Sequence, residues 1–317
     1  MAKYEASPRA DVIQLAMAAD AGFMMPLGVA LTSLCEAHAP GELAVTILHD
    51  GVPAADIARV ERSVAGRIPL TWRQVAPEEV AGAHFSTFLT AASLFRLLLP
   101  QFLPEQIERV IYLDCDVVVT ASLRELWELE LGSTLLAAAR DAGSPFPAGP
   151  CGTEWERLGL DPGAPYFNTG VLVIPVAAWR EADVPRRTLE VLRASEPRWG
   201  DQDGLNVVLQ GRWTELSRRW NLQTPDVDRR GLAWALWRDD VEAALDAPAI
   251  IHYTEREKPW SPGAPHPLAD RWYEVLDRSD WRGWRPGSGS RSLVRRTGSR
   301  VKSAWRALTA KPVSVSA

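Results

Sequence analysis

Two hydrophobic patterns alternate along the first 120 residues of the chain. Short apolar runs, which are typical of buried strands, occupy residues 11–20, 42–50, 69–75 and 109–119. Stretches with apolar residues three and four positions apart, which predict helices, occupy residues 25–38, 53–66 and 90–103. Strands that alternate with helices predict an α/β fold, in which a mostly parallel central sheet is flanked by helices.

Acidic residues stand at the ends of several predicted strands. Asp20, Asp50 and the pair Asp114 and Asp116 each follow or end an apolar run. Because ligands of parallel sheets bind beyond the carboxyl ends of the strands, we expect these carboxylates to share one crevice. On a strand, Asp114 and Asp116 project from one face and Cys115 from the other. Two carboxylates on one face suit Mg²⁺ or Mn²⁺, and a chance pair of structural acids is the alternative.

A further candidate for metal binding follows a later apolar run. Residues 249–251 lead into His252, and Lys258 lies beyond it in the sequence HYTEREKPW. The imidazole of His252 is a candidate third ligand, and a nitrogen ligand favours Mn²⁺ over Ca²⁺. Lys258 carries a point charge that suits a phosphate group. An ordinary surface histidine is the alternative, and the presence of the aspartate pair favours the ligand.

Two more stretches place polar residues where a ligand is expected. In YFNTGVLVIP, Asn168 and Gly170 interrupt an apolar strand, which suggests close approach of the backbone to a ligand. In WGDQDGLN, Asp201, Gln202 and Asp203 precede a helix that is predicted to begin near residue 204. A helix cap accounts for one of these three residues and leaves the others for a functional role.

Composition narrows the class of protein. With 317 residues, of which 46% are hydrophobic, the chain is long enough to bury a full core. No uninterrupted apolar run approaches the roughly 18 residues of a membrane span, and the start MAKYEASPRADV does not predict a secretory signal. Cys35, Cys115 and Cys151 form an odd set without CxxC spacing, which argues against a disulfide framework or a zinc ribbon. We therefore expect a cytoplasmic protein.

Charge is unevenly distributed along the chain. The net charge is −5, but residues 286–317 hold seven basic residues and no acidic one, so the preceding residues carry −12. An acidic body argues against nucleic acid as a partner. The Gly/Ser-rich tail, 286–317, is predicted either to remain solvated or to form a basic amphipathic helix that contacts the inner face of the membrane. Such a helix would align Val294, Val301, Trp305 and Leu308.

Six stretches in this order together resemble glycosyltransferase family 8: AAD, FRLLLP, YLDCDVVV, YFNTGVLVI, DQDGLN and HYTEREKPW. The family has a GT-A type nucleotide-sugar-binding fold and includes lipopolysaccharide galactosyl- and glucosyltransferases and glycogenin. The resemblance covers one domain, residues 10–285. It implies a metal-dependent, retaining enzyme that transfers glucose or galactose from UDP-hexose to an acceptor hydroxyl, with an α-linked product. The implied acceptor is a glycan, a lipid-linked sugar or a small molecule.

The resemblance also implies a role for individual residues. Mn²⁺ or Mg²⁺ would be bound by Asp114, Asp116 and His252. Gln202 and Asp201 would be the catalytic residues, with Gln202 next to the anomeric carbon. The donor would be held by Asp20, at the uracil ring, by Ala18, Ala19, Arg96, Asp114, Cys115 and Asp116, by Asp141 and Asn168 at the sugar, and by Lys258 at the diphosphate.

Two residues depart from the family pattern. Gly22 stands where a polar residue is frequent, and Glu255 stands where glycine is usual, so its carboxylate would repel a diphosphate unless it turns outward or pairs with Arg256. Both departures favour one alternative function, a degenerate protein that binds UDP-sugar without turnover. A second alternative is a phosphatase, in which Asp114 of DCDVV would be phosphorylated. Self-glucosylation on one of the five tyrosines is a third.

Overall fold

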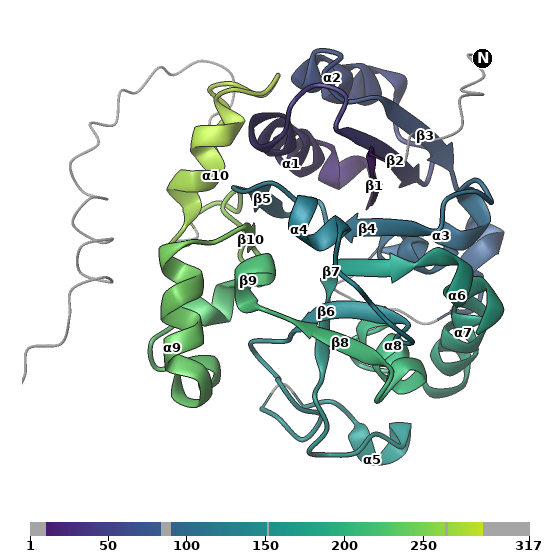
Figure 1. Cartoon of the computed structure of the whole chain (residues 1–317). Helices are drawn as coiled ribbons and strands as arrows, with labels where there is room; N and C mark the ends of the chain where they lie inside the picture. The colour runs from purple at the N-terminus through teal and green to yellow at the C-terminus, as the bar shows by residue number, and fades with distance from the viewer. Residues whose placement is uncertain (1–10, 84–89, 151, 264–265, 288–317) are drawn as a thin grey trace, which may run out of the picture.

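Residues 11–83, 90–150, 152–263 and 266–287 are described by the computed structural model (Figure 1). Their centre is a seven-stranded sheet with the order β3-β2-β1-β4-β7-β6-β8. Its strands are β1 (Ile13–Ala19), β2 (Leu43–His49), β3 (Leu70–Gln74), β4 (Arg109–Leu113), β6 (Leu136–Arg140), β7 (Phe167–Pro175) and β8 (Trp213–Leu216). Neighbouring strands are parallel except around β7, which runs antiparallel to β4 and β6. The predicted α/β fold with a mostly parallel sheet is therefore confirmed.

Helices cover both faces of this sheet. The α-helices are α1 (Met24–Ala37), α2 (Ala54–Val64), α3 (Phe95–Phe102), α4 (Arg124–Trp127), α5 (Trp155–Leu158), α6 (Val176–Glu181), α7 (Val184–Ser195), α8 (Asp201–Leu209), α9 (Leu232–Asp246) and α10 (Ala269–Leu276). One hydrophobic core joins Leu15 and Met17 of β1 to α1, α2 and α10, and another joins Ala16 to α3, α7 and α8. The alternation of side chains along β1 thus feeds two cores.

Short 3-10 helices connect several of these elements. They are η1 (Ala21–Phe23), η2 (Pro77–Val80), η3 (Ala91–Leu94), η4 (Arg218–Asn221) and η5 (Thr224–Val227). The helix predicted over 90–103 is divided in this way, because η3 precedes α3.

A second, three-stranded sheet carries part of the site. It contains β5 (Val117–Val119), β10 (Ile250–His252) and β9 (Leu222–Gln223), in the order β5-β10-β9, with α9 and α10 on its side of the molecule (Figure 1). The run over 109–119 is not one strand, because β4 ends at Leu113 and β5 begins in the other sheet. Asp114 and Asp116 lie in the connection, so the prediction that strand alternation places them on one face is wrong. The bend of the backbone between the sheets brings them together instead.

The helix after residue 200 begins earlier than predicted. Asp201, Gln202 and Asp203 form the first turn of α8, which the sequence pattern placed near residue 204. The residue before them, Gly200, has φ 55° and ψ −127°, a conformation that is essentially restricted to glycine. This turn directs Asp201 and Gln202 toward the central sheet, where both meet side chains of β7 or α3.

None of the described helices has the length and apolar character that a membrane crossing requires. The predicted amphipathic stripe of Val294, Val301, Trp305 and Leu308 lies outside the described residues.

A half-buried histidine, His266, makes the stability of this fold depend on pH. His266 accepts the backbone N–H of Leu268 through Nδ1 at 3.1 Å, which requires a neutral ring. Burial, followed by the charge of Lys258, lowers the pKa of His266 to about 4. Between the ordinary histidine pKa and this value, the unfolded chain binds a proton that the folded chain does not. The free energy of unfolding is therefore expected to fall as pH decreases through this window.

The variant His266→Asn isolates this effect, because its amide oxygen can accept the same N–H without titrating. Lowering the pH from 7 to 5 is expected to cost the wild type about 1 kcal/mol more than the variant, after allowance for solvent around the half-buried ring. Urea unfolding at the two pH values measures both changes. Equal losses in the two proteins would show that His266 does not contribute.

Candidate active site

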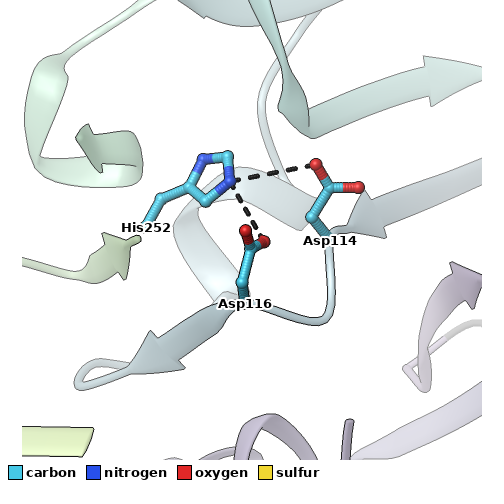
Figure 2. A group of neighbouring side chains, drawn as sticks. All are labelled: Asp114, Asp116 and His252. Carbon is cyan, nitrogen blue, oxygen red and sulfur yellow. Dashed lines mark ion pairs between the residues drawn. The ribbon is translucent and has the colours of Figure 1, made fainter. Parts of the chain in front are cut away.

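Three side chains from the two sheets converge on one point. Asp114 and Asp116 come from the connection between β4 and β5, and His252 ends β10 (Figure 2). The Nε2 atom of His252 lies 3.2 Å from Asp116 Oδ1 and 3.8 Å from Asp114 Oδ2. One ligand atom from each residue lies within 4.8 Å of those of the other two. Two carboxylate oxygens and one imidazole nitrogen form a donor set that fits Mn²⁺ or Mg²⁺.

Lys258 completes this cluster. Its ammonium donates to Asp116 Oδ2 at 2.7 Å and to the backbone carbonyl of Tyr253. Burial alone would raise the pKa of Asp116, but the charges of Lys258 and His252 outweigh it and hold the pKa well below its usual range. Asp116 is therefore ionised at any physiological pH, as a metal ligand must be.

Arg96, in α3, connects the metal cluster to α8. Its guanidinium lies 2.9 Å from Asp114 Oδ1 and 3.1 Å from Asp201 Oδ2, and it donates to the backbone carbonyl of Thr169 at 2.5 Å. Arg96 and Asp201 are 5% and 2% exposed. Burial would lower the pKa of Arg96, but Asp114 and Asp201 raise it well above its usual range. Burial also raises the pKa of Asp201 to about 6, although Arg96 opposes the change.

A second cluster of polar side chains lies where β6, β7 and α8 meet. Asn168 Nδ2 donates to Gln202 Oε1 and to Asp141 Oδ2, each at 3.2 Å. Gln202 Nε2 donates to the same Asp141 oxygen at 3.2 Å. The other oxygen of Asp141 accepts the backbone N–H groups of residues 143 and 144. The cluster thus presents amide and carboxylate groups, which are suited to hydrogen bonding with the hydroxyls of a sugar.

Asp203 is the structural member of the DQD sequence. It accepts the backbone N–H of Trp199 at 2.8 Å and the hydroxyl of Tyr166 at 2.6 Å. The expectation that one of the three residues caps the helix is wrong, because the N-cap residue of α8 is Gly200 and has no side-chain cap hydrogen bond. Asp203 holds the preceding turn instead, while Asp201 and Gln202 face the site.

Gly170 has a different role from the predicted one. A Cβ atom on Gly170 would lie 2.0 Å from Cε1 of His252. The missing side chain therefore makes room for the imidazole ring, and not directly for a ligand. In addition, the carbonyl of Gly170 accepts the backbone N–H of Asp114 at 2.8 Å. The placement of His252 and that of Asp114 thus both depend on Gly170.

The predicted uracil-binding residues lie at the end of β1. Asp20 Oδ1 accepts the backbone N–H groups of Gly22 and Phe23 at 2.8 and 3.1 Å, and so caps η1. A Cβ atom on Gly22 would lie 3.2 Å from Asp20 Oδ1, a tight contact that a side chain at this position would have to relieve by a small shift. The buried thiol of Cys115 donates to the carbonyl of Ala18 at 3.0 Å, and Ala19 is buried beside it. Burial raises the pKa of Cys115 well above its usual range, so the sulfur is not a nucleophile.

Two further residues, Glu255 and Asn221, bear on the predicted site. Glu255 is exposed and lines a pocket together with Thr224 and His266. Asn221 was missed altogether, although it is completely buried and its Oδ1 lies 2.8 Å from His252 Nδ1. It stands in RRWNLQT, where no apolar run or turn signal distinguishes it from a loop residue. Only the pairing of β9 with β10 brings it to the site.

Comparison with known proteins supports one family. Residues 14–263 match the family model described as Glycosyl transferase family 8. General stress protein A of Bacillus subtilis (strain 168) is 26% identical over 282 residues, which cover 86% of this chain and 95% of that protein. Lipopolysaccharide 1,3-galactosyltransferase of Salmonella typhimurium is 24% identical over 285 residues, 86% of this chain and 80% of that protein. The crystal structure of galactosyltransferase LgtC with donor and acceptor sugar analogues has a TM-score of 0.73 at 27% identity, over 86% of this chain and 99% of that chain.

Proposed function

The chain belongs to glycosyltransferase family 8, and on this basis we propose that it transfers glucose or galactose from UDP-hexose to an acceptor hydroxyl. The transfer would retain the anomeric configuration and give an α-linked product. The observation that carries the proposal is the Asp114, Asp116 and His252 cluster, which lies at the carboxyl end of β4 in a GT-A type fold. The names of the lipopolysaccharide galactosyltransferase and of LgtC support a hexose donor.

Asp114, Asp116 and His252 would hold Mn²⁺ or Mg²⁺. When bound, the metal supplies Lewis-acid stabilisation of the charge that develops on the departing diphosphate. Lys258 would add a second positive charge at the same group, because its ammonium already lies beside Asp116. Asp20 and the Ala18–Ala19 backbone remain the predicted contacts of the uracil ring, and Cys115 would support them through its hydrogen bond to Ala18.

The hydrogen-bonded cluster on β7 and α8 would bind the hexose. Asp141 and Asn168 would contact its hydroxyls, and Gln202 would lie beside the anomeric carbon. A neutral amide is a weak nucleophile, so we favour attack from the front face, in which a leaving phosphate oxygen takes the proton of the acceptor hydroxyl. Gln202 would then shield the oxocarbenium-like carbon. Asp201 would act through Arg96, which it shares with the metal ligand Asp114.

The alternatives differ in their support. Membership of a transferase family over residues 14–263 removes the basis for a phosphatase in which Asp114 would be phosphorylated. A degenerate UDP-sugar-binding protein, which Gly22 and Glu255 favour, remains the second candidate, although Asp201 and Gln202 are both present at the site. A glycan, lipid-linked or small-molecule acceptor, the domain limits 10–285 and a cytoplasmic location stay predictions.

Calorimetric titration with UDP tests the donor assignment. We expect wild-type binding to require Mn²⁺ and to disappear with EDTA, and Asp116→Asn to weaken it by about 100-fold, because it removes a ligand charge. Asp239→Asn is the matched control, since Asp239 is an exposed acid in α9 that belongs to neither cluster of the site. Absence of UDP binding under every condition would reject the donor. Binding without hexose transfer across a panel of acceptors would favour the degenerate protein.

A further inference from the structure

Asn221 joins the metal cluster to the cluster that would bind the hexose. It ends η4 and is completely buried. One end of its amide, Oδ1, lies 2.8 Å from His252 Nδ1, and the other end, Nδ2, donates to Asn168 Oδ1 at 3.0 Å. Both ends of the side chain are therefore used, and each contacts a different half of the site.

The direction of these hydrogen bonds is fixed by one backbone group. The N–H of Gly170 donates to Asn168 Oδ1 at 2.9 Å, and a backbone N–H can only donate. The Asn168 atom at that position must therefore be oxygen, and the Asn221 atom that faces the same oxygen must be the amide nitrogen. The carbonyl oxygen of Asn221 then faces His252. Since this oxygen only accepts, Nδ1 of His252 carries a proton, and Nε2 is the nitrogen that faces the aspartates and would bind the metal.

The same backbone N–H sets the orientation of Gln202. With its oxygen held by Gly170 and Asn221, Asn168 turns its NH₂ group toward Gln202 Oε1 and Asp141 Oδ2. Gln202 Oε1 also faces the backbone N–H of Thr169 at 3.4 Å, so its nitrogen is left to donate to Asp141. A single directional chain of amides thus runs from the metal ligand to the residue proposed to lie beside the anomeric carbon.

We propose that Asn221 is a positioning residue, which holds His252 in the Nδ1–H tautomer and couples metal binding to the orientation of Asn168 and Gln202. The metal and the hexose in this statement rest on the proposed function. Partners that orient a metal-binding histidine commonly change metal affinity by about 10- to 100-fold. Asn221 is expected to act in that range although it contacts neither metal nor donor.

The tautomer is the first measurement, because it needs neither metal nor sugar. Nitrogen-15 NMR of the metal-free full chain, labelled at histidine, distinguishes a proton on Nδ1 from one on Nε2. The signals of His252 are assigned by their loss in His252→Gln. We expect a proton on Nδ1 of His252 in the wild type, whatever the state of Nε2, and loss of this fixed position in Asn221→Leu. An Nε2–H tautomer in the wild type would overturn the proposal, whatever the outcome of UDP binding.

Two variants then separate the two arms of Asn221. Asn221→Leu removes both hydrogen bonds and is expected to weaken Mn²⁺ binding, measured by calorimetry without nucleotide, by roughly 10- to 100-fold. Asn221→Asp keeps an oxygen toward His252 but cannot donate to Asn168 when ionised. It is expected to bind Mn²⁺ at least as tightly as the wild type, to keep the Nδ1–H tautomer and to lose hexose turnover through kcat.

A purely structural role predicts a different result. In that case both variants lose Mn²⁺ affinity together and in proportion to their melting temperatures, which would reject the proposal. Unchanged Mn²⁺ affinity in a folded Asn221→Leu would reject it as well. Thr32→Val is the control, because it removes a buried hydroxyl whose hydrogen bond lies within α1, to the carbonyl of Gly28. If Asn221→Leu does not fold, the wild-type tautomer and the Asn221→Asp pattern decide.

Discussion

Gly170→Ala is expected to abolish metal-dependent nucleotide binding in a protein that still folds. The added Cβ would lie 2.0 Å from Cε1 and 2.7 Å from Nδ1 of His252, closer than any relaxed contact. The backbone of Gly170 does not have a positive φ, so alanine is strained there only by the ring. His252 is 3% exposed and cannot move without leaving Asn221 and the two aspartates. We expect a loss of stability of about 1–3 kcal/mol and no measurable Mn²⁺ binding by calorimetry.

Two comparisons make this prediction specific. Gly163→Ala is the matched control, because Gly163 is exposed and its new Cβ would lie 3.7 Å from a carboxylate oxygen of Asp161, which is an ordinary contact distance. In the double variant Gly170→Ala/His252→Ala the ring is gone, so stability should recover relative to Gly170→Ala while Mn²⁺ binding stays lost. Wild-type Mn²⁺ affinity in Gly170→Ala would show that His252 is not held against β7.

The sequence pattern predicted the α/β fold because, in the first half of the chain, the hydrophobic pattern of each segment agrees with the strand or helix that it forms. The apolar runs that lead into Asp20 and Asp114 are the strands β1 and β4, and the parallel direction of β3, β2, β1 and β4 follows from the alternation with helices. The position of β7 did not follow. Its antiparallel insertion between β4 and β6 depends on long-range pairing, to which local hydrophobic patterns are blind.

The sequence identified the residues of the metal cluster, but part of the reasoning that led to them was wrong. Strand ends and unusual polar residues identified Asp114, Asp116 and His252, although the backbone bends between two sheets where a continuous strand was expected. Contacts between distant segments could not be predicted. Examples are the ring of His252 against Gly170 and the amide of Asn221 between His252 and Asn168. Such contacts are decided by packing, and a single sequence carries no pattern that reports them.

Arg96→Met is expected to lower the free energy of unfolding at neutral pH by more than Gly170→Ala does. Methionine fills a similar volume but leaves Asp114 and Asp201, which share the guanidinium, without their common cation. Removal of one partner from a buried ion pair typically costs about 3–5 kcal/mol, because the remaining charge is uncompensated. Urea unfolding at pH 8 measures the loss. UDP binding in the presence of Mn²⁺ should weaken as well, since Asp114 loses the contact that positions it.

The pH dependence of Arg96→Met separates a charge effect from a packing effect. Burial raises the pKa of Asp201 to about 6 even with Arg96 present, and loss of the cation should raise it further. An acid whose pKa is higher in the folded than in the unfolded state gains stability as pH falls through that folded pKa. The deficit of Arg96→Met should therefore shrink between pH 8 and pH 5. It should also shrink at pH 8 in Arg96→Met/Asp201→Asn, because the amide removes one of the two buried charges. A deficit that is independent of pH and of Asp201→Asn would mean that Arg96 stabilises the fold by packing, over the ring of Tyr112 at 4.7 Å, and not as the shared cation of α8 and the metal cluster.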